Sequence, residues 1–125
     1  MREYKILNHK KIPLNIIEGS NITDPSAIII NIHGIGSHFQ KVYECEDSFM
    51  FRENKFLKNN IKIFALEFHG HGKSDGLRCS IDSFDDLVED LLCLVKHIKN
   101  FFKNIPIFIL AESMGGAVAI KYNIK

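Results

Sequence analysis

The sequence predicts an α/β fold with a mostly parallel sheet and helices on both faces. The runs 27–32 and 61–66 are apolar without polar alternation, which is typical of strands covered on both sides. Stretches with helical spacing separate the later strands, so strand and helix alternate along the chain. In addition, three of the expected strands end in loops rich in glycine, histidine or serine.

Length and composition indicate one globular domain. A chain of 125 residues, of which 46% are hydrophobic and 25% charged, can bury a core of its own. The net charge of +1 gives no reason to expect a nucleic acid partner. No apolar stretch reaches the roughly 18 residues that span a bilayer, and the first residues lack the apolar segment of a signal peptide. We therefore expect a cytoplasmic protein with no transmembrane segment.

The first half of the chain predicts four strands and one helix. Two short strands cover 4–7 and 12–17, and Pro13 limits the second to an edge or to its own start. The apolar strand 27–32 follows. A helix is expected from about 43 to 57, before the second apolar strand.

The clearest helix begins after Ser83, which can cap it, with Asp86 in the capping-box position. Its apolar residues recur at helical spacing and form one stripe: Phe84, Leu87, Val88, Leu91, Leu92, Val95 and Ile98. Acidic residues crowd its start and basic residues its end, which suits the helix dipole and needs no binding function. We expect His97, like His9, to be an ordinary surface residue.

Residues 111–116, Ala-Glu-Ser-Met-Gly-Gly, lie between an apolar strand and a helix start. In that context a small-x-Ser-x-Gly sequence predicts a nucleophile elbow. Ser113 must then adopt an unfavourable backbone conformation, at a cost on the order of 1–3 kcal/mol. Its neighbours two residues away must be nearly free of side chains, a need that Gly115 meets and Ala111 approximates. The alternative is an ordinary turn with a capping serine.

Three loops follow strands that are expected to run in the same direction: 33–37, 67–76 and 111–116. The carboxyl ends of parallel strands meet at one edge of the sheet, and ligands bind there. We therefore expect the three loops to build one site.

Four motifs occur in a characteristic order: His-Gly-Ile-Gly-Ser-His at 33–38, Gly-His-Gly-Lys-Ser-Asp-Gly at 70–76, Ser-Phe-Asp-Asp-Leu-Val-Glu-Asp at 83–90 and Glu-Ser-Met-Gly-Gly-Ala at 112–117. With them the chain resembles the α/β-hydrolases, most closely the monoacylglycerol lipase-like or lysophospholipase branch, which is also grouped with the serine aminopeptidases. The resemblance runs from about residue 27 to the C-terminus. It implies that residues 1–125 form the N-terminal part of one α/β-hydrolase domain.

The resemblance also implies roles for individual residues. Ser113 would attack an ester carbonyl and form an acyl-enzyme. The backbone N–H groups of Met114 and Ile35 would form the oxyanion hole, where losing one donor typically costs about 100- to 1,000-fold in rate. Seven residues would shape the site, with the first bracing its loop: His33, Gly34, Gly36, Gly70, His71, Gly72 and Gly115. No cofactor is implied, because acyl transfer needs none.

The sequence departs from the family pattern at two points. Ala111 stands where the family usually has glycine. The family triad runs serine, acid, histidine along the chain, but none of the twelve residues after Ser113 is acidic or a histidine. On this pattern the fold is truncated after the elbow and lacks its later strands and lid. Residues 107–110 would then form an unpaired apolar edge, which a second chain could complete.

An upstream histidine is the alternative source of a base. His33, His69 and His71 belong to the same edge, and a triad is defined by geometry, not by chain order. Glycine-flanked histidines in such loops more often serve loop structure. Together with His38 they fit no common zinc spacing, and the three cysteines form no C-x-x-C pair. We expect no metal site.

The sequence thus supports two functions. The first is a serine hydrolase of carboxylic esters, with a lipid-derived substrate such as a monoacylglycerol or a lysophospholipid. A peptidase, thioesterase or acyltransferase would use the same elbow, and a lipid substrate would allow peripheral contact with membranes. The second is a catalytically inactive remnant of a truncated or split gene that binds another polypeptide through its open edge.

Overall fold

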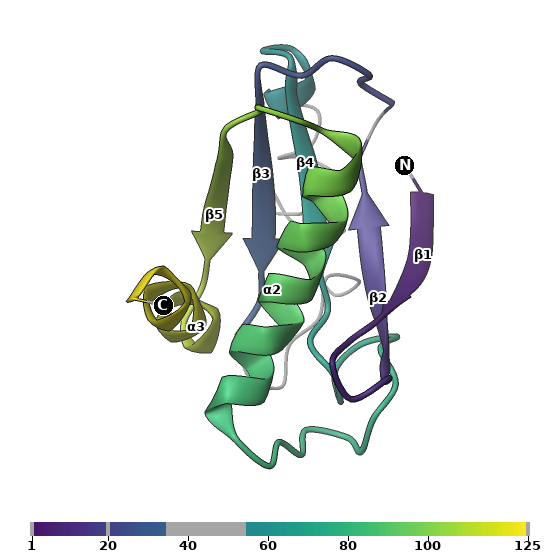
Figure 1. Ribbon diagram of the computed structural model, residues 1–125, viewed down its shortest axis with the longest axis vertical. Coiled ribbons are helices and arrows are strands. Elements are labelled where there is room, and N and C mark those ends of the chain that lie inside the picture. The colour runs from purple at the N-terminus through teal and green to yellow at the C-terminus, as the bar shows by residue number, and fades with distance from the viewer. Residues whose placement is uncertain (1, 20, 35–54, 125) are drawn as a thin grey trace.

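A five-stranded sheet forms the frame of the computed structural model, which describes residues 2–19, 21–34 and 55–124 (Figure 1). The strands and helices are β1 (Arg2–Leu7), β2 (Pro13–Glu18), β3 (Ala27–Ile32), β4 (Ile61–Leu66), α2 (Phe84–Phe101), β5 (Ile107–Ala111) and α3 (Met114–Ile124). Across the sheet the strands lie in the order β1-β2-β4-β3-β5.

Strand β3 is the centre of the parallel part of the sheet. It pairs in parallel with β4 on one side and with β5 on the other, whereas β2 runs antiparallel to both β1 and β4. Ile32, the last residue of β3, is paired with both Leu66 and Ala111, the last residues of β4 and β5. The loops that follow these three strands therefore leave the sheet from the same row.

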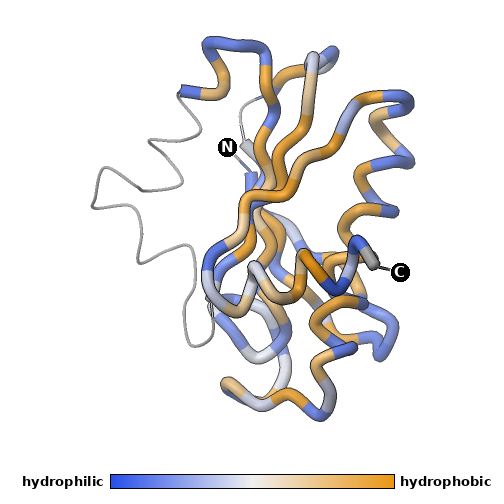
Figure 2. The backbone as a smooth tube through the Cα atoms, turned by 90° about the vertical axis from the view of Figure 1, so that its left-hand side faces the viewer, coloured by the Kyte–Doolittle hydropathy of each residue, from blue (hydrophilic) through white to orange (hydrophobic). Residues whose placement is uncertain are grey.

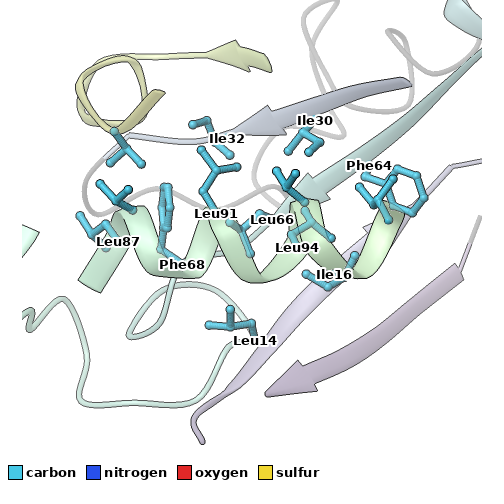
Figure 3. Close-up of a cluster of buried hydrophobic side chains, with 14 of the residues drawn as sticks. Leu14, Ile16, Ile30, Ile32, Phe64, Leu66, Phe68, Leu87, Leu91 and Leu94 are labelled. Carbon is cyan, nitrogen blue, oxygen red and sulfur yellow. The ribbon is translucent and has the colours of Figure 1, made fainter. Parts of the chain in front are cut away.

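Helices α2 and α3 pack against one face of the sheet and contact each other. Alternate strand residues and the apolar stripe of α2 form the main core (Figure 3), which includes Leu14, Ile16, Ile28, Ile30, Ile32, Phe64, Leu66, Leu87, Leu91 and Leu94. Burying each such side chain contributes about 1.5–3 kcal/mol. Figure 2 shows the same division along the chain, with hydrophobic strands inside and many hydrophilic residues in the outer turns.

The second face carries a smaller apolar cluster of Ile17, Ile63 and Ala65, against which Ile29 and Phe56 pack. Phe56 belongs to a helical turn over residues 55–57. Most of the helix expected over 43–57 lies outside the described residues. Helical residues thus pack on both faces, which agrees with the layering that the sequence predicts.

The strands lie close to their expected bounds. Pro13 is the first residue of β2, which pairs on both sides, so the proline marks a strand start and not an edge. The sequence places the start of the last helix after residue 116, but α3 begins three residues earlier, at Met114. The reason is that the Ser113 carbonyl accepts the N–H groups of Gly116 and Ala117. Within the described ranges, no helix combines the length and apolarity needed to cross a bilayer.

The side chain of Asn31 on β3 is buried and has no hydrogen bond to any residue that the structure describes. The residue is 1% exposed, and neither polar atom of its side chain has a partner in the part of the chain that the structure describes. An unsatisfied buried group of this kind costs about 1–3 kcal/mol.

We expect Asn31→Val to raise the free energy of unfolding by about 1–2 kcal/mol, because valine removes that cost and suits a strand. Urea denaturation measures the change.

Asn15→Val is the matched control for this prediction. Asn15 of β2 is also buried, at 3% exposed, but its Nδ2 donates to Glu67 Oε1 at 2.8 Å. The same substitution there should lower the free energy of unfolding, because it leaves the carboxylate with one donor fewer. Loss of stability in both variants would contradict the assignment of an unpartnered Asn31.

Candidate active site

Ser113 stands at the turn between β5 and α3 with an exposed side chain. Its φ is 50°, in the left-handed region that residues with side chains rarely adopt. The N–H of Gly115 donates to the Glu112 carbonyl at 2.8 Å, and that of Gly116 donates to the Ser113 carbonyl at 2.9 Å. Strand, strained serine and helix therefore follow one another as an elbow requires.

The two expected oxyanion donors differ in what the structure describes. Met114 is the first residue of α3, so helix geometry gives its N–H no intrahelical partner. This N–H also lies at the positive end of the helix dipole, which favours an anion. Ile35, the second expected donor, and Gly36 lie outside the described residues.

The loop after β3 approaches Ser113 closely. A methyl group built on Gly34 would lie 3.2 Å from Ser113 Cβ and 3.8 Å from its Oγ. At Gly115 the packing is tighter, since a methyl group there would lie 2.7 Å from the His33 carbonyl oxygen. Ala111 is half-buried at the edge of the main core, which accommodates its methyl group.

His33 fastens the loop after β3 to the loop after β4. Its Nε2 accepts the Phe68 N–H at 3.1 Å, so Nδ1 carries the proton and donates to the Gly34 carbonyl at 2.6 Å. The ring is 3% exposed and contacts the rings of Phe68 and His71, with centroids 5.1 and 5.0 Å away. With both nitrogens engaged, His33 holds loop structure.

The loop after β4 folds around the buried carboxylate of Glu67. Oε1 of this residue accepts the Asn15 side-chain amide at 2.8 Å and the Lys73 N–H at 3.2 Å. Ser74 Oγ donates to the Glu67 carbonyl at 2.5 Å. Gly72, with a φ of 54°, lies directly over the carboxylate, and any Cβ there would overlap Glu67 Oε2. The loop therefore requires glycine at this position.

His71 sits between two glycines of positive φ, Gly70 at 76° and Gly72. Its Nδ1 donates to the His69 carbonyl at 3.1 Å, which leaves Nε2 unprotonated in the neutral ring. That Nε2 is buried and has no partner within the ranges that the structure covers. No hydrogen bond there joins the Ser113 hydroxyl to His33, His69 or His71.

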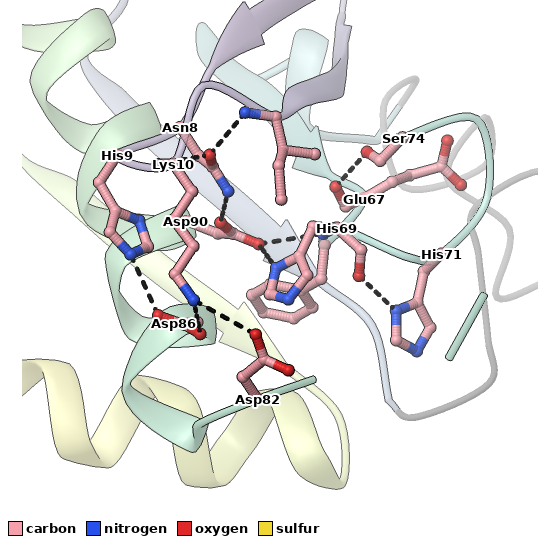
Figure 4. A network of polar contacts seen from close by, with 12 residues as sticks. Asn8, His9, Lys10, Glu67, His69, His71, Ser74, Asp82, Asp86 and Asp90 are labelled. Carbon is pink, nitrogen blue, oxygen red and sulfur yellow. Dashed lines mark hydrogen bonds and ion pairs between the residues drawn. The ribbon is translucent and has the colours of Figure 1, made fainter. Parts of the chain in front are cut away.

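The carboxylate of Asp90, on α2, ties three segments together (Figure 4). It is fully buried and accepts the Asn8 side-chain amide at 2.8 Å, the His69 N–H at 3.0 Å and His69 Nδ1 at 2.6 Å. Asn8 in turn accepts the N–H of Ile12, so the β1–β2 turn, the loop after β4 and α2 share one anchor. This bond to Asp90 raises the pKa of His69, because it favours the charged imidazolium.

Asp86 does not complete the expected capping box. Ser83 does cap α2, since its Oγ accepts the Asp85 N–H at 3.2 Å. The Asp86 carboxylate instead binds His9 at 3.1 Å and Lys10 at 2.8 Å, both in the β1–β2 turn. His9 is exposed, as expected, and it fastens the β1–β2 turn to α2 from the surface.

The family model described as "Serine aminopeptidase, S33" matches residues 23–125. The chain belongs to this family. Rat monoglyceride lipase (Rattus norvegicus) is 34% identical over 97 residues, which is 77% of this chain and 29% of the lipase. Caffeoylshikimate esterase from Arabidopsis thaliana is 33% identical over 92 residues, which is 70% of this chain and 25% of the esterase.

A solved structure of an esterase from Pyrococcus furiosus has a TM-score of 0.74 and 24% identity over 96% of this chain and 44% of the esterase. That likeness confirms the α/β-hydrolase fold. The chain spans a third or less of the length of the curated relatives that it matches first. The S33 match covers all three loops that follow the parallel strands.

In this S33 protein the buried acids that hold the loops, Glu67 and Asp90, were not among the site residues that the sequence predicts. Asp90 lies three residues after Leu87 and four before Leu94, so it falls on the apolar stripe of α2, and that position was the available indication. Glu67 has no such periodic pattern around it. Among the residues that the structure describes, no group of three or more histidine, cysteine or acidic side chains is placed to hold a metal ion.

The two neighbouring glycines of α3 provide a test of the close approach at the elbow. We expect Gly115→Ala to lower the free energy of unfolding by about 1–3 kcal/mol, because its methyl group would collide with the backbone after β3. At Gly116 an added methyl group meets nothing within 4 Å. Gly116→Ala should therefore stabilise the helix by about 0.5–1 kcal/mol. Thermal unfolding compares the stabilities of the two variants. Equal changes in stability would contradict the close approach of Gly115 to the backbone after β3.

The His69–Asp90 pair predicts a pH-dependent stability. The folded state holds a proton that the unfolded chain releases near pH 6.5, because the pKa of His69 is raised on folding. The contribution of this pair to the free energy of unfolding is complete below pH 6.5, and it is lost as the pH rises through the pKa of His69 in the folded state. The slope from this group is at most about 1.4 kcal/mol per pH unit. Urea unfolding between pH 6 and 9 measures it.

Asp90→Asn should remove this contribution to the slope, because the imidazolium loses its carboxylate partner. Asp82→Asn is the control, since Asp82 is exposed and pairs only with Lys10, at 3.6 Å, among the described residues. This variant should keep the wild-type slope. An unchanged slope in Asp90→Asn would show that another group causes the pH dependence.

Proposed function

We propose that this protein is a serine hydrolase of carboxylic esters in which Ser113 is the nucleophile. The observation that carries the proposal is the exposed Ser113 with its φ of 50° at the strand–helix junction. Gly34 lies beside its side chain, and the N–H of Met114 begins the helix that follows. Membership of the S33 family and the esterase and lipase relatives support this reaction class.

The proposed reaction proceeds in two steps. Ser113 Oγ attacks the ester carbonyl while a general base takes its proton, the alcohol leaves, and an acyl-enzyme forms. Water then releases the carboxylic acid by the same route. The N–H groups of Met114 and Ile35 are the proposed donors to the oxyanion in both steps. Gly34, without a side chain, leaves room beside Ser113 Oγ for the scissile bond.

The general base is not assigned to any of the three histidines that the structure describes in these loops. His33, His69 and His71 are each bonded within the loops, and none of them bonds the Ser113 hydroxyl in the described part. A serine hydroxyl is a weak nucleophile without a base. The proposal therefore takes the general base from a histidine other than these three.

The proposed substrate is a lipid ester, such as a monoacylglycerol or a lysophospholipid. Support comes from two relatives, the monoglyceride lipase of the rat and the monoacylglycerol lipase of Mycolicibacterium smegmatis. A peptidase, thioesterase or acyltransferase would use the same elbow. We place the enzyme in the cytoplasm, where free thiols such as those of Cys79 and Cys93 stay reduced, with peripheral access to membranes.

A fluorophosphonate probe tests the nucleophile. We expect the full-length protein to be labelled at Ser113, and Ser113→Ala to lose labelling and to lose ester hydrolysis by 1,000-fold or more, on the order seen for other catalytic serines. Ser80→Ala, at an exposed serine of the loop after β4, should leave both unchanged. Labelling that persists in Ser113→Ala would reject the assignment. Comparing a monoacylglycerol, a lysophospholipid, an aminoacyl arylamide and an acyl thioester then decides the substrate class.

A second candidate function is an interaction module without catalysis. Its support is the outer edge of β5, where Phe108 is 58% and Leu110 38% exposed and where no strand pairs in the described ranges. An apolar strand edge of this kind can add a strand from another chain. A purified protein that stays monomeric and captures no partner would remove the basis for this candidate.

A further inference from the structure

A hydrogen-bonded network leads from Asp90 of α2 to the loop after β3 (Figure 4). The backbone N–H of His69 and its Nδ1–H both donate to Asp90 Oδ2, at 3.0 and 2.6 Å. The N–H of the preceding residue, Phe68, donates to His33 Nε2 at 3.1 Å. His33 Nδ1 in turn donates to the Gly34 carbonyl at 2.6 Å. These five residues are the members of the network.

The network ends beside Ser113. A methyl group built on Gly34 would lie 3.2 Å from Ser113 Cβ. The Gly34 carbonyl shares one peptide group with the N–H of Ile35, the proposed second oxyanion donor. A peptide group is planar, so a bond that orients the carbonyl also orients the N–H of the same group. The bond from His33 Nδ1 therefore acts on the proposed oxyanion hole.

The four members with side chains are buried. Asp90 and Phe68 are 0% exposed, His33 is 3% exposed and His69 is 6% exposed. Hydrogen bonds are stronger in such surroundings than in water. Asp90 also accepts the side-chain amide of Asn8 at 2.8 Å, on its other oxygen. The network thus begins at a carboxylate that is held from two sides in the interior.

The peptide groups on either side of Phe68 have separate partners. The N–H of the first group donates to His33, and the N–H of the second group, which is that of His69, donates to Asp90. Both backbone angles of Phe68 are therefore restrained. The side chain of His69 adds a second bond to the same carboxylate oxygen, so the imidazole helps to fix the direction of the Phe68 N–H.

We propose that His69 and Asp90 are positioning residues for the reaction at Ser113, a role that rests on the proposed function. Through the Phe68 N–H they hold His33 in the tautomer whose Nδ1 carries the proton, and His33 then orients the loop after β3. An oxyanion exists in the transition state and not in the bound ester. Loss of this support should therefore lower kcat and leave KM unchanged.

Two substitutions of His69 test the role of its side-chain donor. Leucine has no donor for Asp90, whereas the amide of asparagine offers one near the position of Nδ1. In the full-length protein we expect His69→Leu to lower kcat for ester hydrolysis about tenfold, because a small displacement near the reacting atoms costs up to about 100-fold. KM should stay within about twofold of wild type. His69→Asn should restore most of the lost kcat.

His9→Leu is the matched control. His9 also bonds an aspartate of α2, since its Nε2 lies 3.1 Å from Asp86 Oδ1, but it belongs to the β1–β2 turn. Its loss breaks a histidine–aspartate bond to the same helix outside the network, so kcat should not change. The end point of fluorophosphonate labelling counts the folded sites in each variant, and kcat is expressed per labelled site.

Hydrogen exchange gives a readout that does not depend on activity. The Phe68 N–H should exchange faster in His69→Leu than in wild type and in His69→Asn, because its direction is then less restrained. Unchanged exchange in His69→Leu would overturn the proposal.

Labelling of the wild-type protein separates this proposal from the proposed function. A wild type that is not labelled at Ser113 rejects the nucleophile, and the positioning role with it. If the wild type is labelled and His69→Leu keeps the wild-type kcat, only the positioning role is rejected. A loss of kcat that His9→Leu shares, or that His69→Asn does not reduce, would also reject that role.

Discussion

The pairing of β3 with both β4 and β5 is the constraint on which the rest of the structure depends. Parallel hydrogen bonding places Ile32, Leu66 and Ala111 in one row, so three loops start side by side. The buried side chains of Ile28 and Ile30 on the α2 face hold this register. A shift by one residue would turn them to the other face. The site at the edge is thus a consequence of sheet packing.

Glycines and buried acids convert that common edge into fixed geometry. Gly115 lets α3 approach the backbone after β3, and the strain of Ser113 is held between two packed elements. On the other side, Glu67 shapes the loop after β4, and Asp90 ties it to α2 and to the β1–β2 turn. A strained residue persists where its surroundings determine its position in this way.

The two ends of the sheet differ in chemistry. Ser113 and the glycine-rich loops lie where the parallel strands end, and the loops there are held by backbone and buried polar contacts. At the other end, aromatic rings from β1 and α2 line a cavity beside Arg2. Both ends share helix α2. Its first half binds the loop after β4 through Asp90, and its second half contributes the rings of His97 and Phe101 to the cavity.

The sequence by itself determined the strands 27–32 and 61–66, the Ser83 cap and the elbow around Ser113, because apolar runs, caps and glycine patterns act locally. Only the tertiary structure decided what the charged side chains do. Asp86 and Asp90 suit a helix dipole in sequence, but they bind residues about 77 to 82 positions away. His97 likewise gained the ring of Tyr4 as a neighbour from β1. Such partners meet only when the sheet and α2 pack, so no local pattern indicates them.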